Sequence, residues 1–330
     1  MWVCKDCFAD EEIRKDVENN STEEGRCDVC GKTGKRCDIS VFTDFFVSVI
    51  KLFKTDINSQ DTIFSILEKD WNIFTDSQCA RTILAEVIRI SGLAINLEDK
   101  VSYSDDIVAR ASVWEQLKIE VKENYRYFVD HEKFDSYADL SPSATLKEGS
   151  FLFRARITPD GQKKLKPKNM GCPDKGKATA GRANPLGIPY LYLCKDEETT
   201  FYEVRSVYLD RLSIGKFQIQ RGLNIVDFNS KSSLFLSFDG TNSLSDTVVK
   251  KLIQDAISRD LSKPLRRYDT ELEYIPTQLI CEYCKRNNAD GICFNSSLHS
   301  GGVNYVLFNP DDAKCIRVDS REIKSIQITV

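Results

Sequence analysis

The sequence predicts an α+β chain in which a small four-cysteine segment and a helical bundle precede a domain built on a mixed or antiparallel sheet. Three observations predict it: two C-x2-C pairs near the start, helical spacing over residues 41–129, and short β-branched or aromatic runs after residue 150. A length of 330 residues suits two or three domains. We expect their boundaries at 1–38, 39–140 and 145–330.

Composition excludes several classes of protein. Hydrophobic residues make up 41% and charged residues 29%, which is typical of a soluble globular chain. A net charge of −4 gives no general attraction to nucleic acid or membrane, and no apolar run approaches the ~20 residues that a spanning helix needs. The first residues lack the features of a signal peptide, so we expect a cytoplasmic protein.

The first segment carries the spacing of a metal site. Cys4 and Cys7 form one C-x2-C pair, Cys27 and Cys30 form another, and nineteen residues separate the pairs. Four thiolates fill the tetrahedral shell of Zn²⁺ and leave no position for water, so the sequence predicts a structural zinc ion. Residues 10–26 contain almost no apolar side chains, so we expect the metal to organise them.

Residues 41–129 contain no proline and a single glycine, Gly92. Apolar side chains recur at intervals of three and four over 41–53, 61–74, 80–90 and 107–129, which favours a small helical bundle. Residues 130–150 break the pattern with proline, glycine and small polar residues and mark a boundary.

The remaining chain alternates irregularly between short strands and helices. We expect strands at 151–157, 188–194, 217–220, 223–228, 291–296, 303–308 and 315–318, and helices at 197–209, 245–257 and 276–286. The last helix holds Cys281 and Cys284, which have no second pair nearby and are interpreted as buried packing residues.

Four places in this part carry side chains that a core does not need. Arg154 and Arg156 lie on one face of a strand and require an anionic partner, either a carboxylate or a ligand phosphate. Residues 161–182 hold six lysines and Arg182 against one acid, which indicates either a diphosphate-binding loop or a solvated surface.

The other two places supply a carboxylate and a hydroxyl. Asp196 is a plausible N-cap for a helix that carries Glu203 among apolar neighbours, a candidate for a partly buried carboxylate. The strand at 291–296 ends in polar residues that include Ser296 and Ser297. No G-x-S-x-G, P-loop or G-x-G-x-x-G motif is present, which disfavours a serine hydrolase and a standard nucleotide fold.

Together these segments resemble the RES family, named for its arginine, glutamate and serine. The similarity rests on the FRAR run from Phe153, the string at 170–205 with its glycine-arginine, LYL strand and glutamate helix, and the runs DGICFNSS and GGVNYVLF that follow in order. It covers roughly residues 145–320. The resemblance implies an ADP-ribosyltransferase-like fold and an NAD⁺-consuming toxin. More loosely, residues 39–140 resemble the HEPN-like helical domain, zinc-bearing in some relatives, that accompanies certain RES domains.

The resemblance also implies site residues. The expected catalytic residues are Glu203, Arg154 and Ser296, and the expected NAD⁺-binding residues are Arg154, Gly181, Arg182, Tyr192 and Ser296. Ala155 stands where many RES toxins have an aromatic residue, and Ser297 competes with Ser296 for the role of the serine.

The implied reaction is cleavage of the N-glycosidic bond of NAD⁺, with water, phosphate or a protein side chain as the acceptor. The expected partners are NAD⁺ and an inhibitor, antitoxin or trigger protein that restrains the activity; nucleic acid is not expected, and homo-oligomerisation is left open.

Two rival functions remain. Arg126 and His131 have the R-x4-H spacing of HEPN ribonucleases, although five residues on a helix place two side chains about 140° apart. Alternatively, the chain is a non-catalytic nucleotide-sensing or interaction module, because a fold by itself does not establish an activity.

Overall fold

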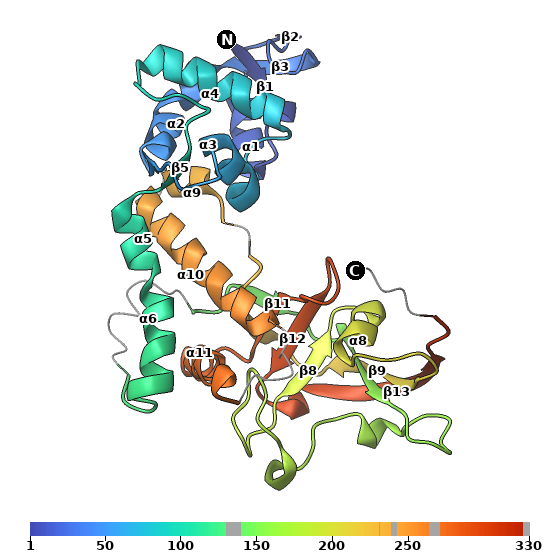
Figure 1. Ribbon diagram of the computed structural model, residues 1–330. Coiled ribbons are helices and arrows are strands. Elements are labelled where there is room, and N and C mark those ends of the chain that lie inside the picture. Colours follow the sequence, from blue (N-terminus) through green and yellow to red (C-terminus); the bar gives the residue numbers. More distant parts are fainter. Residues whose placement is uncertain (130–139, 231, 239–242, 264–270, 326–330) are drawn as a thin grey trace. The chain divides into compact units, whose positions relative to one another are not determined.

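The computed structural model describes residues 1–129, 140–230, 232–238, 243–263 and 271–325, and Figure 1 traces its elements. The chain divides into two compact units. Unit 1 comprises residues 1–112 and 231–252, and unit 2 comprises residues 113–230 and 253–330. The predicted boundaries at 1–38, 39–140 and 145–330 stay a prediction, because the compact units group residues by packing and each draws on two pieces of chain.

Unit 1 combines a small sheet with short helices. Its strands are β1 (Trp2–Cys4), β2 (Glu23–Arg26), β3 (Thr33–Asp38), β4 (Phe53–Thr55) and β5 (Val101–Tyr103). Its helices are α1 (Glu11–Asn19), α2 (Thr43–Ile50), α3 (Ile63–Ile66) with a π-helical turn at Leu67–Trp71, α4 (Ser77–Ser91), α5 (Asp105–Ala111) and α9 (Leu234–Phe238). The strand order β1-β3-β2 is antiparallel, and β4 pairs with β5.

The core of unit 1 is aromatic. Phe8 and Phe74 lie with ring centroids 5.9 Å apart, and Phe46 stacks on Phe74 at 5.6 Å. Helix α1 adds Ile13 and Val17, both fully buried. The segment between the cysteine pairs therefore also buries an apolar stripe of an otherwise polar helix, and its organisation by a metal stays a prediction.

Unit 2 is built on a mixed sheet of eight strands. They are β6 (Ala144–Leu146), β7 (Phe151–Ile157), β8 (Leu191–Cys194), β9 (Arg211–Ile219), β10 (Leu223–Asp227), β11 (Gly291–Asn295), β12 (Val303–Leu307) and β13 (Ala313–Glu322). Their order in the sheet is β13-β9-β7-β8-β12-β11-β10-β6, in which only β10 and β11 run parallel. The predicted α+β class with a mixed sheet is therefore confirmed.

Among its described residues, unit 2 has the helices α6 (Val113–Ile119) with a π-helical turn at Glu120–Asn124, α8 (Glu197–Glu203) and α11 (Ile275–Arg286). Helix α10 (Leu244–Ser262) begins in unit 1, and its residues from Ile253 belong to unit 2. Phe201 of α8 and Val204, which follows it, pack against the buried cluster of Ala155, Leu212 and Ile214, and this packing fixes α8 against the sheet. Helix α11 buries Cys281 and Cys284 completely, as the sequence predicts.

Two strands are longer than their sequence patterns. The runs at 217–220 and 315–318 become the nine-residue β9 and the ten-residue β13, which pair along their whole lengths with one irregularity between Cys315 and Arg317. Polar residues at both ends hide the alternation, and the pairing extends the strands because every second residue pair of an antiparallel ladder exchanges two hydrogen bonds. Among the described residues, no helix is both long and apolar enough to cross a membrane.

Candidate active site

Helix α8 holds Glu203 at its last position. Asp196 caps the helix, and its Oδ1 accepts a hydrogen bond from the backbone N–H of Thr199 at 2.8 Å, as the sequence predicts. Beyond the helix, Arg205 adopts a φ of 49°, which turns the chain out of the direction of α8. Glu203 is exposed rather than partly buried, because it faces an open cavity at the helix end.

Two side chains that are far from Glu203 in the sequence fix its carboxylate. Ser296 Oγ donates a hydrogen bond to Glu203 Oε1 at 2.7 Å, and Asn304 Nδ2 donates to the same oxygen at 2.8 Å. Ser296 follows β11 and Asn304 lies in β12, so the antiparallel pair β11–β12 brings both to the end of α8. The glutamate and serine that the resemblance implies are therefore adjacent, and Asn304 is a member of the site that sequence reasoning missed.

The two candidate serines have different surroundings. Ser296 Oγ accepts hydrogen bonds from the backbone N–H groups of Leu298 at 3.2 Å and His299 at 3.1 Å while it donates to Glu203. Ser297 Oγ donates instead to the carbonyl oxygen of Ser262. The geometry thus associates Ser296, and not Ser297, with the glutamate.

A cavity of about 360 Å³ opens beside this pair. Its wall consists of Gly181, Arg182, Tyr192, Leu193, Glu203, Arg205, Leu261, Ser262, Tyr274, Phe294, Leu298, Asn304 and Tyr305. Four of the predicted site residues therefore line one cavity: Gly181, Arg182, Tyr192 and Glu203. Aromatic rings beside two arginines and one carboxylate suit a ligand that has both a ring and anionic groups.

Helix α11 holds the Gly181–Arg182 turn with two hydrogen bonds. Thr277 Oγ1 donates to the carbonyl oxygen of Arg182 at 2.6 Å, and Gln278 Nε2 donates to that of Gly181 at 2.8 Å. A side chain at Gly181 would lie 2.5 Å from Asn184 Oδ1 and 2.9 Å from the hydroxyl of Tyr192. Only glycine fits there, because those two groups are themselves hydrogen-bonded at 2.8 Å.

Arg182 and Tyr192 are both desolvated. Arg182 Nη1 donates to the carbonyl oxygen of Asp260 at 2.9 Å, and its guanidinium lies 5.7 Å from the ring centre of Tyr274. Burial lowers the pKa of Arg182 and raises the pKa of Tyr192. A desolvated guanidinium binds an anion more strongly than one in water, so the partial burial of Arg182 would strengthen its binding of an anionic ligand.

Arg154 does not line this cavity. It lies in β7 beside Cys172, with burial as the first cause and Arg156 as the second cause of a lowered pKa. Its Nη1 is buried and donates no hydrogen bond to the described residues. Arg156 Nη2 donates to the carbonyl oxygen of Gly171, so these arginines are covered by the loop that precedes β8. The role of Arg154 in binding stays a prediction.

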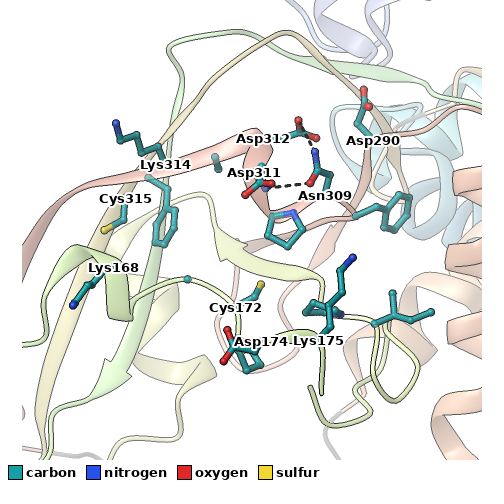
Figure 2. Close-up of a pocket in the computed structure, with 18 of the residues that line it drawn as sticks. Lys168, Cys172, Asp174, Lys175, Asp290, Asn309, Asp311, Asp312, Lys314 and Cys315 are labelled. Atoms are coloured by element: carbon teal, nitrogen blue, oxygen red, sulfur yellow. Dashed lines mark hydrogen bonds between the residues drawn. The ribbon is translucent and has the colours of Figure 1, made fainter. Parts of the chain in front are cut away.

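The lysines of residues 161–182 lie away from Glu203. Lys164 Nζ donates to the carbonyl oxygen of Val318 at 2.7 Å, and Lys177 lies 3.5 Å from Asp174. Lys168 and Lys175 line a second, larger cavity of about 1000 Å³, which Figure 2 shows. Of the basic side chains in this run, Arg182 alone lines the Glu203 cavity, so the run is not one phosphate-binding loop.

The second cavity has balanced charges. Four lysines and four aspartates contribute to its wall: Lys168, Lys175, Lys285, Lys314, Asp174, Asp290, Asp311 and Asp312. Arg221 already pairs with Asp290 at 2.7 Å and with Asp312 at 2.9 Å. The side chains in Figure 2 therefore do not select one class of ligand.

The four predicted metal ligands come together in unit 1. The Sγ atoms of Cys4, Cys7, Cys27 and Cys30 all lie within 4.8 Å of one another. The pairs Cys4–Cys30 and Cys7–Cys27 are 3.4 and 3.5 Å apart, close to the roughly 3.8 Å between sulfurs on a tetrahedral zinc ion. The donor set therefore fits a metal ion, and all four positions of a tetrahedral shell would be filled by protein.

The structure does not test the predicted ribonuclease pair. Arg126 is exposed, and His131 lies outside the described residues. His299, the other histidine, contributes its ring to a different contact: Nδ1 lies 2.9 Å from Thr199 Oγ1, and the ring stacks on Tyr202 with centroids 4.7 Å apart.

Fold and site together define an α+β domain in which a glutamate and a serine, Glu203 and Ser296, meet beside a cavity that Arg182 lines. The sequence matches the RES domain family over residues 152–325, and the chain belongs to this family. No curated protein matches the sequence. Among solved structures, the chain is similar to one in the "Crystal structure of the M.tuberculosis MbcT-MbcA toxin-antitoxin complex", with 11% identity and a TM-score of 0.31 over 66% of this chain and 92% of that chain.

Proposed function

We propose that the chain is an enzyme that cleaves the N-glycosidic bond of NAD⁺ and acts as a toxin or defence effector. The observation that carries this proposal is the Glu203 carboxylate, which Ser296 holds at 2.7 Å on the wall of a cavity that Arg182 shares. Membership of the RES family supports it, because the resemblance of the motifs implies an NAD⁺-consuming toxin.

The reaction needs a group that stabilises positive charge. When the bond between the ribose carbon and nicotinamide breaks, its electron pair leaves with the nicotinamide nitrogen and neutralises the pyridinium. The ribose is left with oxocarbenium-like charge, which then accepts a nucleophile. A carboxylate in the position of Glu203 interacts with this charge more strongly in the transition state than in the ground state, and so accelerates the step.

The remaining residues suit binding. Arg182 offers a desolvated, planar guanidinium for the diphosphate, with a bidentate geometry that lysine lacks. Tyr192 and Gly181 shape the turn that presents Arg182. We propose that Arg154 supports the binding of NAD⁺ and that Ser296 orients the Glu203 carboxylate. A volume of about 360 Å³ lies near the lower end of the ~300–1,000 Å³ typical of ligand pockets, which favours entry of one half of the dinucleotide.

The acceptor decides the class of enzyme. Water gives a glycohydrolase and phosphate gives a phosphorylase. A protein acceptor gives an ADP-ribosyltransferase, and one observation favours it: Val207, Tyr208 and Leu209, which follow Arg205 of the cavity wall, are 60%, 61% and 63% exposed. Exposed apolar residues in a row are typical of a protein contact.

The decisive experiment follows nicotinamide release from NAD⁺ by the purified chain, with and without phosphate. We expect release that Glu203→Gln lowers by about 10³-fold. Glu197→Gln is the matched control, because Glu197 lies on the same helix and pairs with Arg321 at 2.7 Å. Dependence on phosphate identifies the phosphorylase, and labelled NAD⁺ that marks a protein identifies the transferase. Equal turnover in Glu203→Gln and wild type would reject the proposed role.

Two further parts of the proposal concern metal and partners. We propose that Cys4, Cys7, Cys27 and Cys30 hold a structural zinc ion, since four thiolates are the ligand set that Zn²⁺ prefers. An active NAD⁺ consumer would damage its own cell, so we also propose an inhibitor, antitoxin or trigger protein. Co-purification of a neighbouring gene product that suppresses nicotinamide release would support it.

A further inference from the structure

We propose that Asn304 is a positioning residue that fixes the orientation of the Glu203 carboxylate, so that Oε1 is held by the protein and Oε2 is presented to the substrate. This inference rests on the proposed function and deepens it. It concerns a residue that the arginine–glutamate–serine pattern does not include.

The orientation of the Asn304 side chain is set by its neighbour in the sheet. Asn304 of β12 pairs in register with Cys194 of β8, and Cys194 Sγ donates to Asn304 Oδ1 at 3.3 Å. Burial raises the pKa of Cys194, which keeps its thiol protonated and able to donate. With Oδ1 committed to this thiol, the Nδ2 group points to Glu203, and the two ends of the amide cannot exchange without losing both bonds.

The carboxylate is therefore asymmetric. Oε1 accepts from both Ser296 and Asn304, whereas Oε2 accepts no hydrogen bond from the residues that the structure describes. Asn304 is 9% exposed and belongs to a strand paired on both sides, so it is a rigid donor. Ser296 sits on the chain after β11 and depends on two backbone N–H groups for its own orientation. Asn304 therefore restrains the Glu203 carboxylate more firmly than Ser296 does.

Several other titratable groups lie close to Glu203. Those that share its cavity are Arg182 and Arg205, the phenols of Tyr192, Tyr274 and Tyr305, and the buried thiol of Cys194 lies behind Asn304. An N–H donor to Oε1 favours the charged carboxylate, whereas a second carboxylate in its place would oppose it.

The sharpest variant is Asn304→Asp, which keeps size and shape but replaces the donor with an acceptor. We expect kcat to fall by about 10²-fold with KM changed less than threefold, because the group acts through Glu203 and not on the substrate. The acidic limb of the pH profile of kcat should move upward by about one pH unit, since two adjacent carboxylates titrate as a pair. Asn304→Ala should lower kcat by about tenfold or more without that displacement.

Asn169→Asp is the control, because it adds the same charge at an exposed position of the same unit. Thermal unfolding of each variant identifies loss of fold. A rise in KM with kcat unchanged would overturn the proposal, since Asn304 would then bind the substrate directly; so would a pH profile that matches wild type in Asn304→Asp.

A second measurement separates this inference from the proposed function. If the wild-type chain releases no nicotinamide, the function fails, but the Glu203 carboxyl can still be titrated by NMR in carbon-labelled protein, with Glu203→Gln to assign the signal. A pKa of Glu203 that rises by about one unit or more in Asn304→Asp supports the contact, and an unchanged pKa rejects it.

Discussion

The four-thiol cluster of unit 1 and the Glu203 cluster of unit 2 are assembled in opposite ways. Within each C-x2-C pair, two residues separate the two cysteines, and all four cysteines lie within Cys4–Cys30. Glu203 meets Ser296 and Asn304 across 93 and 101 residues of chain. A turn of four residues constrains its two cysteines directly, whereas the second cluster exists only once the strands of the sheet have paired.

This difference explains how much could be predicted. The cysteine spacing was sufficient to predict which four thiols come together, without any knowledge of a family. Glu203 and Ser296 were identified through the resemblance, and their contact agrees with it. Asn304 was missed because nothing in GGVNYVLF separates a strand asparagine that faces a carboxylate from one that faces solvent; only the register between β8 and β12 does so.

The fold shows the same division. Runs with clear periodicity, such as residues 151–157 and 276–286, became β7 and α11 nearly as expected. The three-residue strands β4 and β5 were not expected, because their pairing joins Phe53 to Tyr103 and short runs carry no period. The lysines at 161–182 were misleading for a similar reason: sequence charge does not show which cavity a loop faces.

The largest effect should come from the locally assembled cluster. Cys4→Ser should abolish binding of one zinc ion per chain and lower the unfolding temperature by more than about 10 °C, because structural zinc contributes on the order of 10 kcal/mol to small metal domains. Metal analysis and calorimetry measure both quantities. Cys315→Ser is the control, as its thiol is half-buried and outside the cluster. Unchanged melting after chelation would show that Ile13, Val17 and the aromatic core suffice.

Substitution of the arginines proposed to bind NAD⁺ near Glu203 should have a smaller effect. Arg182→Ala should raise KM for NAD⁺ by about 10- to 100-fold, because a charge-assisted hydrogen bond contributes about 1.5–3 kcal/mol. Arg154→Ala should raise KM less, since Arg154 does not line the cavity. Steady-state kinetics of both variants, with their unfolding temperatures, make the comparison. A larger rise for Arg154→Ala would mean that the loop over β7 moves when NAD⁺ binds.

Gly181→Ala tests whether binding at the Glu203 cavity depends on the close approach of Gly181 to Asn184. The added carbon would lie 2.5 Å from Asn184 Oδ1, so the turn must shift, and we expect KM to rise by about tenfold. Gly176→Ala in the same loop is the control, because nothing lies within 4 Å of its added carbon. Identical KM values for the two variants would contradict the fit of this turn.

The smallest contrast separates neighbouring serines. Ser296→Ala should lower kcat by about tenfold, since Glu203 loses a hydrogen bond, whereas Ser297→Ala should change it by no more than about threefold. Nicotinamide release at saturating NAD⁺ measures both. The reverse order would assign the family serine to Ser297.

Helix α8 also limits how this chain can vary in length. Asp196 fixes its first turn and Glu203 ends it, so the helix of seven residues sets the spacing from the cap to the carboxylate. Each residue in a helix turns the next side chain by about 100°, so one insertion or deletion in this interval would aim the carboxylate away from Ser296 and Asn304. Relatives that keep the chemistry should therefore differ here by replacement alone, while insertions and deletions collect in the loops on either side.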